Sequence, residues 1–381
     1  MSARPTAIIF TDRLLPFSQA FIKRQGEALR DYRPLFLGLR PGGQRDWLTA
    51  ESVLLCEHES WLGILAFGLG LPSHRLLAEL RGRNPAIIHA HFGPNGLLAL
   101  PLARALGLPL VVTYHGYDAF RHSLLQEVGW LGRYYALNKW RLPGSICRIL
   151  CVSEALRTEL IRKGFSPALL ETHYIGVDTD VFAPLPESEP RQNWLAFVGR
   201  LVPDKGCDVA IRVAARLQQT FADLRLKIVG DGPERPALTL LAESLGCNAD
   251  FMGVLPDDEI RAMLARSKAL IGPSRAMPSG AVEAFGLVFI EAQSCGTPVL
   301  ATRLGGIPEG VSEERTGFLF PQDAVPRAVE FGRRLLADDR LWQTMSRAAR
   351  DHAVANFDLE AQTRKLERIY DEVRRSGPRV P

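Results

Sequence analysis

The sequence lacks the features that mark a zinc-stabilised, exported or membrane-spanning protein. Its six cysteines are scattered, and no CxxC pair or Cys/His cluster has the spacing of a zinc site. The N-terminus shows no signal-peptide pattern. The longest apolar stretch, Trp61 to Leu71, is about half of the ~20 residues that a transmembrane helix needs, and glycines interrupt it. We therefore expect a cytoplasmic protein without a structural metal, in which this stretch is a core segment.

The sequence also has little excess of positive over negative charge. The formal net charge is only +4 over 381 residues, which gives no argument for a nucleic-acid partner. Lysine in particular is rare, with seven lysines against 39 arginines. A lysine that follows a strand beside a glycine is therefore a better candidate for a functional residue than it would be in a lysine-rich chain.

Short β-branched runs alternate with longer helical patterns, which is typical of βα units that build parallel sheets covered on both faces. The predicted fold class is α/β. A first doubly wound domain is predicted over residues 1–175, with six strands: Ala7 to Phe10, Pro34 to Leu39, Ser52 to Cys56, Ala86 to His91, Leu110 to Tyr114 and Ile149 to Val152.

The pattern restarts after a stretch rich in proline and acidic residues, which predicts an interdomain linker over residues 176–192. A second doubly wound domain is predicted over residues 193–357, with strands Trp194 to Val198, Leu226 to Val229, Asp250 to Met252, Ala269 to Ile271 and Val299 to Ala301. Residues 358–381 form a helix and tail after it. Ligands are expected in a cleft that the two domains face.

The segment EAFGLVFIE places two carboxylates, Glu283 and Glu291, around an aromatic-Gly turn that opens an apolar helix. If the helix begins near Leu287, the N–H groups of Gly286, Leu287 and Val288 form an anion site. Glu291 lies one turn further, where its carboxylate can accept hydrogen bonds from a ribose diol. Glu283 can do the same for a sugar. A single glutamate would more often be a helix cap, but the pair around the turn favours a binding site.

The segment VGRLVPDKG follows the first strand of the second domain and carries Arg200 and Lys205. Ligands bind at the carboxyl edge of open α/β sheets. Two cations at this edge match the roughly two negative charges of a diphosphate. The alternative is solvated surface charge.

In the first domain, LVVTYHGYD places His115, Gly116 and Asp118 at the carboxyl end of a strand. His115 can hydrogen-bond a sugar hydroxyl, although a purely structural histidine fits the pattern equally well. His89 and His91 are predicted to face opposite sides of their strand, and therefore not to bind a metal together.

Two further motifs are weak. Gly230-Asp231-Gly232 follows a strand, as a dinucleotide fingerprint would, but Arg235 occupies the position of the third glycine. Asp178 and Asp180 form a DxD pair, which could hold a metal on a donor diphosphate, but the pair falls in the predicted linker. We therefore predict no metal site.

Together these motifs resemble glycosyltransferase family 4, the retaining enzymes of GT-B fold. The match is specific in the second half, where VGRLVPDKG, GDGPER, EAFGLVFIE and GTPVLATRLGGIPE follow in the family's order. The first half, with HAHFGPNG and YHGYD, looks most like bacterial exopolysaccharide or colanic-acid-type enzymes. That subgroup usually has Ser-Glu-Thr-Phe where this chain reads Ser18-Gln19-Ala20-Phe21.

The resemblance assigns Arg200 and Lys205 to the diphosphate, Glu283 and His115 to the transferred sugar, and Glu291 to ribose. The backbone of Gly286, Leu287 and Val288 would contact phosphate and sugar. It implies a UDP- or GDP-linked sugar as co-substrate without a further cofactor, and a glycan or lipid-linked acceptor. A nucleotide-sugar 2-epimerase and a non-catalytic nucleotide-binding partner subunit of the same fold are the alternatives.

The segment from Arg121 to Arg148 combines basic and aromatic residues with a single acidic residue, Glu127. Such a segment suits an anionic membrane surface, and would make the protein peripheral on the inner face of the cell membrane. A buried amphipathic helix explains the pattern equally well. The residues concerned are Arg121, Arg133, Lys139, Arg141, Arg148, Trp130, Tyr134, Tyr135 and Trp140.

Overall fold

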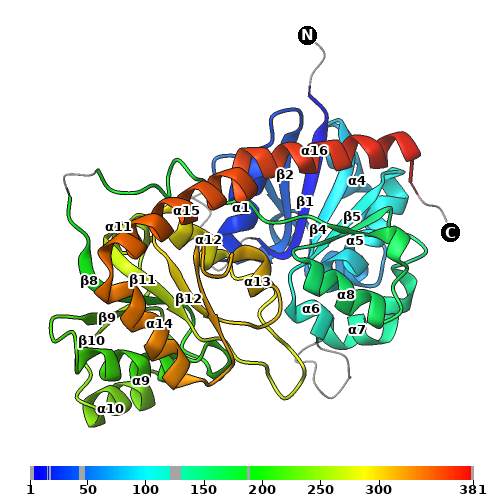
Figure 1. The fold of residues 1–381 in the computed structure, drawn as a ribbon. Helices are drawn as coiled ribbons and strands as arrows, with labels where there is room; N and C mark the ends of the chain where they lie inside the picture. Colours follow the sequence, from blue (N-terminus) through cyan, green and yellow to red (C-terminus); the bar gives the residue numbers. More distant parts are fainter. Residues whose placement is uncertain are drawn as a thin grey trace. The chain divides into compact units, whose positions relative to one another are not determined.

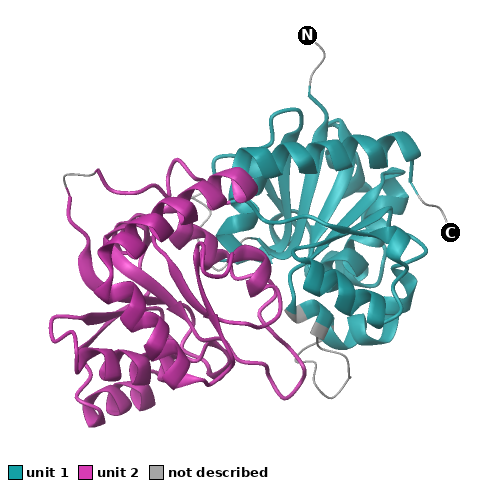
Figure 2. Cartoon of the chain, viewed as in Figure 1, with its two compact units in different colours: residues 1–176, 359–381 teal, residues 177–358 magenta. Residues whose placement is uncertain are grey.

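The computed structural model describes residues 4–14, 16, 19–42, 48–120, 130–186 and 189–378. The chain forms two compact units, which are Met1–Gly176 with Leu359–Pro381, and Val177–Asp358 (Figure 2). Each unit contains one parallel sheet with helices on both faces (Figure 1). The predicted α/β class with two Rossmann-like domains is therefore confirmed.

The sheet of unit 1 has seven strands in the order β3-β2-β1-β4-β5-β6-β7. The strand order reverses between β1 and β4, as in other doubly wound sheets. The strands are β1 (Thr6–Leu14), β2 (Arg33–Pro41), β3 (Glu51–Leu54), β4 (Pro85–His91), β5 (Leu110–Tyr114), β6 (Arg148–Cys151) and β7 (Leu170–Thr172). The helices are α1 (Ala20–Glu27), α2 (Leu55–His58), α3 (Trp61–Gly68), α4 (His74–Arg81), α5 (Gly93–Leu106), α6 (Tyr117–Phe120), α7 (Trp130–Asn138), α8 (Glu154–Arg162) and α16 (Leu359–Ser376), with the 3-10 turns η3 (Lys139–Arg141) and η4 (Pro167–Leu169).

The sheet of unit 2 has six strands in the order β10-β9-β8-β11-β12-β13, and its order reverses between β8 and β11. The strands are β8 (Gln192–Val198), β9 (Arg225–Val229), β10 (Ala249–Gly253), β11 (Ser267–Gly272), β12 (Val299–Thr302) and β13 (Gly317–Phe320). The helices are α9 (Cys207–Gln218), α10 (Arg235–Ser244), α11 (Asp257–Arg266), α12 (Leu287–Ser294), α13 (Ile307–Gly310), α14 (Val325–Ala337) and α15 (Asp339–Phe357), with the 3-10 turn η5 (Pro203–Lys205).

The C-terminal helix α16 belongs to unit 1, although it follows unit 2 in the sequence (Figure 1). Its buried residues recur every three or four positions and pack with α1 and the sheet. The buried Glu367 carboxylate accepts the backbone N–H groups of Arg30 and Asp31, both at 2.7 Å. Tyr370 reaches β4, where its hydroxyl lies 2.6 Å from Nδ1 of His89. The helix thus completes the buried interior of unit 1.

All the strands expected from the sequence are present, and two further ones were missed. The short strands β7 and β13 each pair at the edge of their sheet, with only three and four residues respectively. The strand expected over Ser52 to Cys56 ends at Leu54, because Leu55 and Cys56 begin α2. The helix expected after the second domain is α16.

The prediction that Trp61 to Leu71 is a core segment is wrong. Only Phe67 of α3 is buried, where its ring packs against Phe10 with centroids 6.1 Å apart. Trp61 is 73% exposed and Leu69 is 70% exposed. The helix is apolar on all sides, but it lies at the surface of unit 1 and buries only one side.

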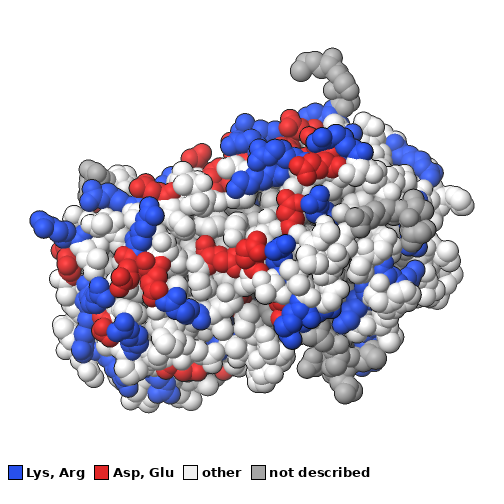
Figure 3. Space-filling view, turned by 45° about the vertical axis from the view of Figure 1, so that its right-hand side comes forward, with Lys and Arg blue, Asp and Glu red and all other residues white. Residues whose placement is uncertain are grey.

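Acidic and basic side chains are interspersed over the face drawn in Figure 3, in keeping with the small net charge. Within the described ranges, no helix combines the length and the apolar character needed to cross a membrane.

Candidate functional site

In unit 2 the loops after β8 and β11 leave the sheet where the strand order reverses, which is the usual ligand position of an open α/β sheet. The loop after β8 carries Arg200 and Lys205. It is fixed by the loop after β9, because Gly199 N–H donates to Val229 O and Leu201 N–H donates to Asp231 O. The Gly230-Asp231-Gly232 motif therefore supports this loop.

Lys205 and Glu283 meet at this edge of the sheet. Lys205 Nζ donates to Glu283 Oε2 at 2.5 Å, and both side chains are largely shielded from solvent. Gly305 and Gly306 hold the backbone of Glu283, since Gly306 N–H donates to Glu283 O at 3.0 Å. A Cβ on Gly305 would lie only 2.1 Å from that same oxygen, so a larger residue would displace Glu283.

Helix α12 begins at Leu287, as the sequence predicts, after Gly286 with φ +81° in the left-handed region. The N–H groups of its first turn have no intrahelical acceptors, and the helix dipole adds a positive potential there. Val288 lines the same small cavity as Lys205 and Glu283, together with Ser274 from the loop after β11. Glu291 is half-buried one turn further along α12.

The structure therefore brings Lys205, Glu283 and Val288 together around one cavity, with Gly286 and Leu287 adjacent in the chain. Arg200 is exposed on the same loop and, among the described residues, forms no ion pair. The arrangement offers a cation, a carboxylate and a helix N-terminus at one edge of the sheet. Such a set can compensate a diphosphate and accept hydrogen bonds from a polyol.

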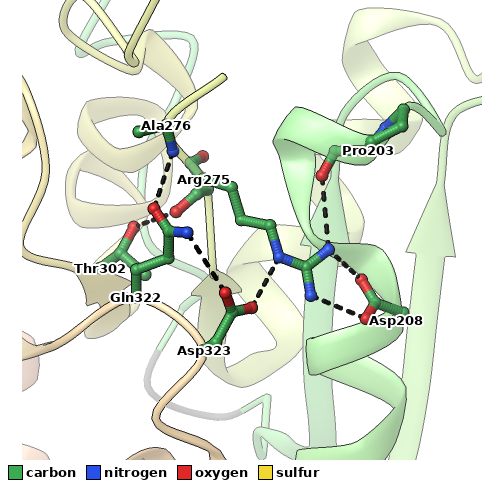
Figure 4. Close-up of polar contacts among 8 residues, drawn as sticks. Pro203, Asp208, Arg275, Ala276, Thr302, Gln322 and Asp323 are labelled. Carbon is green, nitrogen blue, oxygen red and sulfur yellow. Dashed lines mark hydrogen bonds and ion pairs between the residues drawn. The ribbon is translucent and has the colours of Figure 1, made fainter. Parts of the chain in front are cut away.

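Sequence reasoning missed Arg275, which connects three loops of this site (Figure 4). Its guanidinium binds both carboxylate oxygens of Asp208 at 2.7 and 2.8 Å, and donates to Asp323 at 2.6 Å. Its backbone N–H donates to Asp204 O at 2.8 Å, next to Lys205. Hydrogen bonding to Asp208 raises the pKa of Arg275, so its guanidinium stays charged. No motif pointed to this residue because its partners are far apart in the sequence.

Gln322 and Thr302 complete the same connection. Gln322 accepts the backbone N–H of Ala276, and the Thr302 hydroxyl donates to Ser274 O, both at 2.8 Å (Figure 4). The loop after β11, which lines the cavity through Ser274, is thus bound on one side to the loop that carries Lys205 and on the other to the ends of β12 and β13.

In unit 1, Asp118 organises the loops after β4 and β5. Its carboxylate accepts the backbone N–H groups of Gly93 at 2.9 Å, His115 at 3.1 Å and Gly116 at 2.9 Å. Burial nevertheless raises the pKa of Asp118 to about 6. These bonds fix the backbone of His115, so Asp118 has a structural role that the HGYD pattern does not reveal.

His89 and His91 lie on the same face of β4, and the prediction of opposite faces is wrong. Residues two apart in a strand point the same way, and the two ring centroids are 4.3 Å apart. His91 Nδ1 lies 3.1 Å from His115 Nε2, while His89 contacts Tyr370 and Thr113. Over the described residues, no group of three or more His, Cys, Asp or Glu side chains could hold a metal ion.

Three polar atoms after strands of unit 1 are buried and lack a hydrogen-bond partner within the described part of the chain: Gln19 Oε1, Asn95 Oδ1 and His115 Nδ1. They follow β1, β4 and β5 respectively, and so lie toward the carboxyl edge of the sheet. Buried polar atoms are nearly always hydrogen-bonded. Each of these three atoms can therefore hydrogen-bond a water molecule or a polar ligand at this edge. Ser18, beside Gln19, lies outside the described residues.

The segment from Arg121 to Arg148 is described only from Trp130 onward, so Arg121 and Glu127 lie outside the described residues. Tyr135 is buried, whereas Leu137 and Trp140 are exposed. A cavity of about 350 Å³ adjoins this segment, and Asp118, Lys139, Trp140 and Lys163 are among the residues that line it. Burial lowers the pKa of Lys163 to about 8.

Asp178 of the DxD pair caps a turn. Its Oδ1 accepts the backbone N–H groups of Asp180 at 3.1 Å and Val181 at 2.9 Å. Beside this turn, Val177 N–H donates to Phe357 O at 2.8 Å, so the two segments that link the units run next to each other in unit 2.

Two family models match the chain: Glycosyltransferase Family 4 over residues 48–181 and Glycosyl transferases group 1 over residues 183–352. A GDP-mannose-dependent alpha-(1-6)-phosphatidylinositol monomannoside mannosyltransferase of Mycolicibacterium smegmatis is 34% identical over 72% of this chain and 74% of its own. A glycogen synthase of Mycobacterium tuberculosis is 31% identical over 79% of this chain and 72% of its own.

Solved structures share the fold at low identity. Anabaena HepE, crystallised with UDP and glucose, superposes with a TM-score of 0.76 at 20% identity, covering 96% of this chain and 99% of its own. Sucrose-phosphate synthase of Thermosynechococcus elongatus gives a TM-score of 0.74 at 20% identity, covering 97% and 99%.

The buried histidines predict that mild acid destabilises unit 1. Burial lowers the pKa of His115 to about 3 and of His173 to about 4, and it also lowers those of His89 and His91. Below pH ~6.5 the unfolded chain therefore binds protons that the folded chain does not, so stability is lost as pH falls toward the folded values. Each histidine contributes up to ~1.4 kcal/mol per pH unit to the slope.

Urea unfolding at a series of pH values from neutral to mildly acidic measures this slope. His173→Gln should reduce it, because glutamine can still donate to Gln362 O but cannot take up a proton. His74→Gln, at an exposed position of α4, should leave it unchanged. A stability of unit 1 that does not fall over this range would contradict the prediction.

Arg275→Met should weaken binding of a nucleoside diphosphate by about tenfold or more, because charge-assisted hydrogen bonds contribute ~1.5–3 kcal/mol and their loss frees the loops that hold Lys205 and Ser274. Arg275→Lys should recover only part of the affinity, since lysine cannot form the two parallel hydrogen bonds that the guanidinium makes to Asp208. Calorimetric titration measures the affinity. Arg266→Met, which removes a solvent-exposed ion pair at the opposite, amino edge of the same sheet, is the control and should bind normally. Normal binding by Arg275→Met would show that the loops do not depend on this fork.

Proposed function

This chain belongs to glycosyltransferase family 4 and acts on nucleotide sugars, and we propose that it is a retaining, metal-independent hexosyltransferase. The proposed donor is a UDP- or GDP-linked hexose, which is a co-substrate, and no further cofactor is needed. The proposed acceptor is a glycan or a lipid-linked glycan in bacterial exopolysaccharide or cell-surface polysaccharide synthesis. The observation that carries the proposal is the cavity of unit 2, where Lys205, Glu283 and the start of α12 converge.

We assign the donor diphosphate to Arg200, Lys205 and the N–H groups of Gly286, Leu287 and Val288. Burying roughly two uncompensated negative charges would cost several kcal/mol, and this edge of the sheet offers two cations and a helix N-terminus. Glu291 is proposed to accept hydrogen bonds from the ribose diol, and Glu283 from the transferred sugar. HepE, whose fold is similar, was crystallised with UDP and glucose, which supports a nucleotide-sugar donor.

The chemistry that we propose is electrostatic and needs no protein nucleophile. The bond from the anomeric carbon to the diphosphate oxygen breaks, and the acceptor hydroxyl attacks from the same face. A donor phosphate oxygen takes the hydroxyl proton. Negative charge grows on the leaving diphosphate, and we propose that Arg200, Lys205 and the helix N-terminus stabilise it there.

On the acceptor side, we propose that His115 of unit 1 hydrogen-bonds the transferred sugar. Within the described residues, Nδ1 of His115 has no hydrogen-bond partner, which supports this role. The cavity that Lys139 and Lys163 line supports an acceptor that carries a phosphate, because cations suit that group. Such an acceptor on a lipid carrier would make the enzyme cytoplasmic and peripheral on the inner face of the cell membrane.

The two carboxylates should have separable roles. Glu291→Ala should weaken binding of both the free nucleoside diphosphate and the intact donor by about tenfold or more, because a diol contact common to both is lost. Glu283→Gln should weaken binding of the intact donor only, and should slow transfer. Titration of each variant with the nucleoside diphosphate and then the nucleotide sugar separates the cases. Glu259→Ala, exposed on α11, is the control. Equal weakening of nucleoside diphosphate binding by both substitutions would overturn the assignment.

Transfer should survive excess EDTA and depend on the two cations. Lys205→Ala and Arg200→Ala should each slow transfer by about ten- to a hundredfold, because each charge-assisted bond contributes ~1.5–3 kcal/mol. Arg212→Ala, exposed on α9, should be silent. The donor is first chosen by a thermal-shift screen of UDP- and GDP-sugars. Activity that EDTA abolishes and magnesium or manganese restores, with both substitutions nearly silent, would instead direct attention to Asp178 and Asp180.

A further inference from the structure

In the part of unit 1 that the structure describes, large apolar side chains are exposed in two places. The first is α3 and the turn after it, where five such side chains lie within the stretch that the sequence suggested was core. The second is the end of α7 and η3, where Leu137 is 58% and Trp140 is 75% exposed. We call these seven residues the α3–η3 surface: Trp61, Leu62, Leu65, Leu69, Leu71, Leu137 and Trp140.

Both parts lie on one face of the sheet. Gly26 of α1 is close to Ile9 of β1, and Ile9 belongs to the buried cluster that includes α16. The next residue, Phe10, points to the opposite face, where it contacts Phe67 of α3. Helix α3 therefore covers the face of the sheet that α1 and α16 leave free.

Helix α5 covers that same face and joins the two parts. Val111 of β5 belongs to the cluster with α16, whereas Val112 points the other way and packs under Gly96 of α5. The turn after α3 reaches α5 where Gly70 lies beside Pro101, and η3 also packs on α5. The two apolar parts thus belong to one helical layer that flanks α5.

The charges around this layer indicate the charge of a partner that would bind it. From Ser60 to Ser73 the chain has no charged residue, and from Trp130 to Arg148 it has four cations and no carboxylate. Among the described residues, Arg133, Lys139 and Arg141 form no ion pair, and Arg133 lies one helical turn before the exposed Leu137. Trp140 Nε1 donates to Leu137 O at 3.0 Å, which satisfies the indole while its ring stays exposed.

We propose that the α3–η3 surface binds an anionic lipid bilayer, with its tryptophans and leucines in the interfacial region and Arg133 and Arg141 at the anionic headgroups. Tryptophan is favoured at that depth, and apolar insertion beside cations is the usual pattern of interfacial binding. A symmetric pairing of two copies through this face would oppose like charges. The inference rests on the proposed lipid-linked acceptor and specifies the surface that would approach it.

Co-sedimentation of the full chain with vesicles tests the proposal. Vesicles of phosphatidylcholine with phosphatidylglycerol should bind it at low salt, and vesicles of phosphatidylcholine alone should bind it more weakly. The double variant Trp61→Ser/Leu65→Ser should lose about tenfold or more in partitioning, because apolar area no longer inserts. Arg133→Gln and Arg141→Gln should each lose about fivefold, and only with the anionic vesicles. Trp61→Phe should retain binding, and Leu240→Ser, 65% exposed in unit 2, is the matched control.

Donor binding, measured by thermal shift without vesicles, separates this proposal from the proposed function. Normal donor binding by Trp61→Ser/Leu65→Ser, with vesicle binding lost, supports the surface and shows that the variant is folded. Equal sedimentation of the wild type and this variant would overturn the surface while leaving the transferase function standing. Self-association that the variant abolishes, without vesicle binding by the wild type, would also overturn it. Vesicle binding without binding of any nucleotide sugar would count only against the function.

Discussion

The ion pair between Lys205 and Glu283 is the interaction on which the candidate site depends. Parallel strands deliver both residues to the same edge of the sheet, and the reversal of strand order between β8 and β11 leaves space beside them. The pair holds the ammonium and the carboxylate in a fixed orientation before any ligand arrives. Preorganised charges of this kind stabilise a leaving group without reorganisation at the moment of reaction.

Neither partner of that pair is held by its own loop alone. Gly305 and Gly306 fix the backbone of Glu283 from the loop after β12, while Arg275 connects the segment around Lys205 to Asp208 and Asp323. The geometry of two residues thus depends on loops that follow β8, β11, β12 and β13. The planar guanidinium of an arginine connects loops better than the single ammonium charge of a lysine, because its several hydrogen bonds fix orientation as well as distance.

The sequence predicted the fold class and the start of α12, because both depend on short-range patterns. Strand-helix alternation predicted the two parallel sheets, and the apolar run after Gly286 predicted the start of α12 at Leu287. Long-range pairing was not accessible in the same way. The roles of Arg275 and of α16 depend on partners far away in the chain, and β7 and β13 are strands mainly because a neighbouring strand is there to pair with them.

The error over Trp61 to Leu71 has a different origin. Hydrophobicity measures the free energy gained if a side chain leaves water, and says nothing about which surface receives it. A helix that is apolar on every side is usually buried on every side, but α3 lies at the surface of unit 1, and Phe67 is its one fully buried residue. Its leucines and Trp61 stay exposed to solvent, so burying them against a partner would still lower the free energy. Exposed apolar side chains of this kind commonly mark an interaction surface, and the cations in the same helical layer favour a partner that carries negative charge.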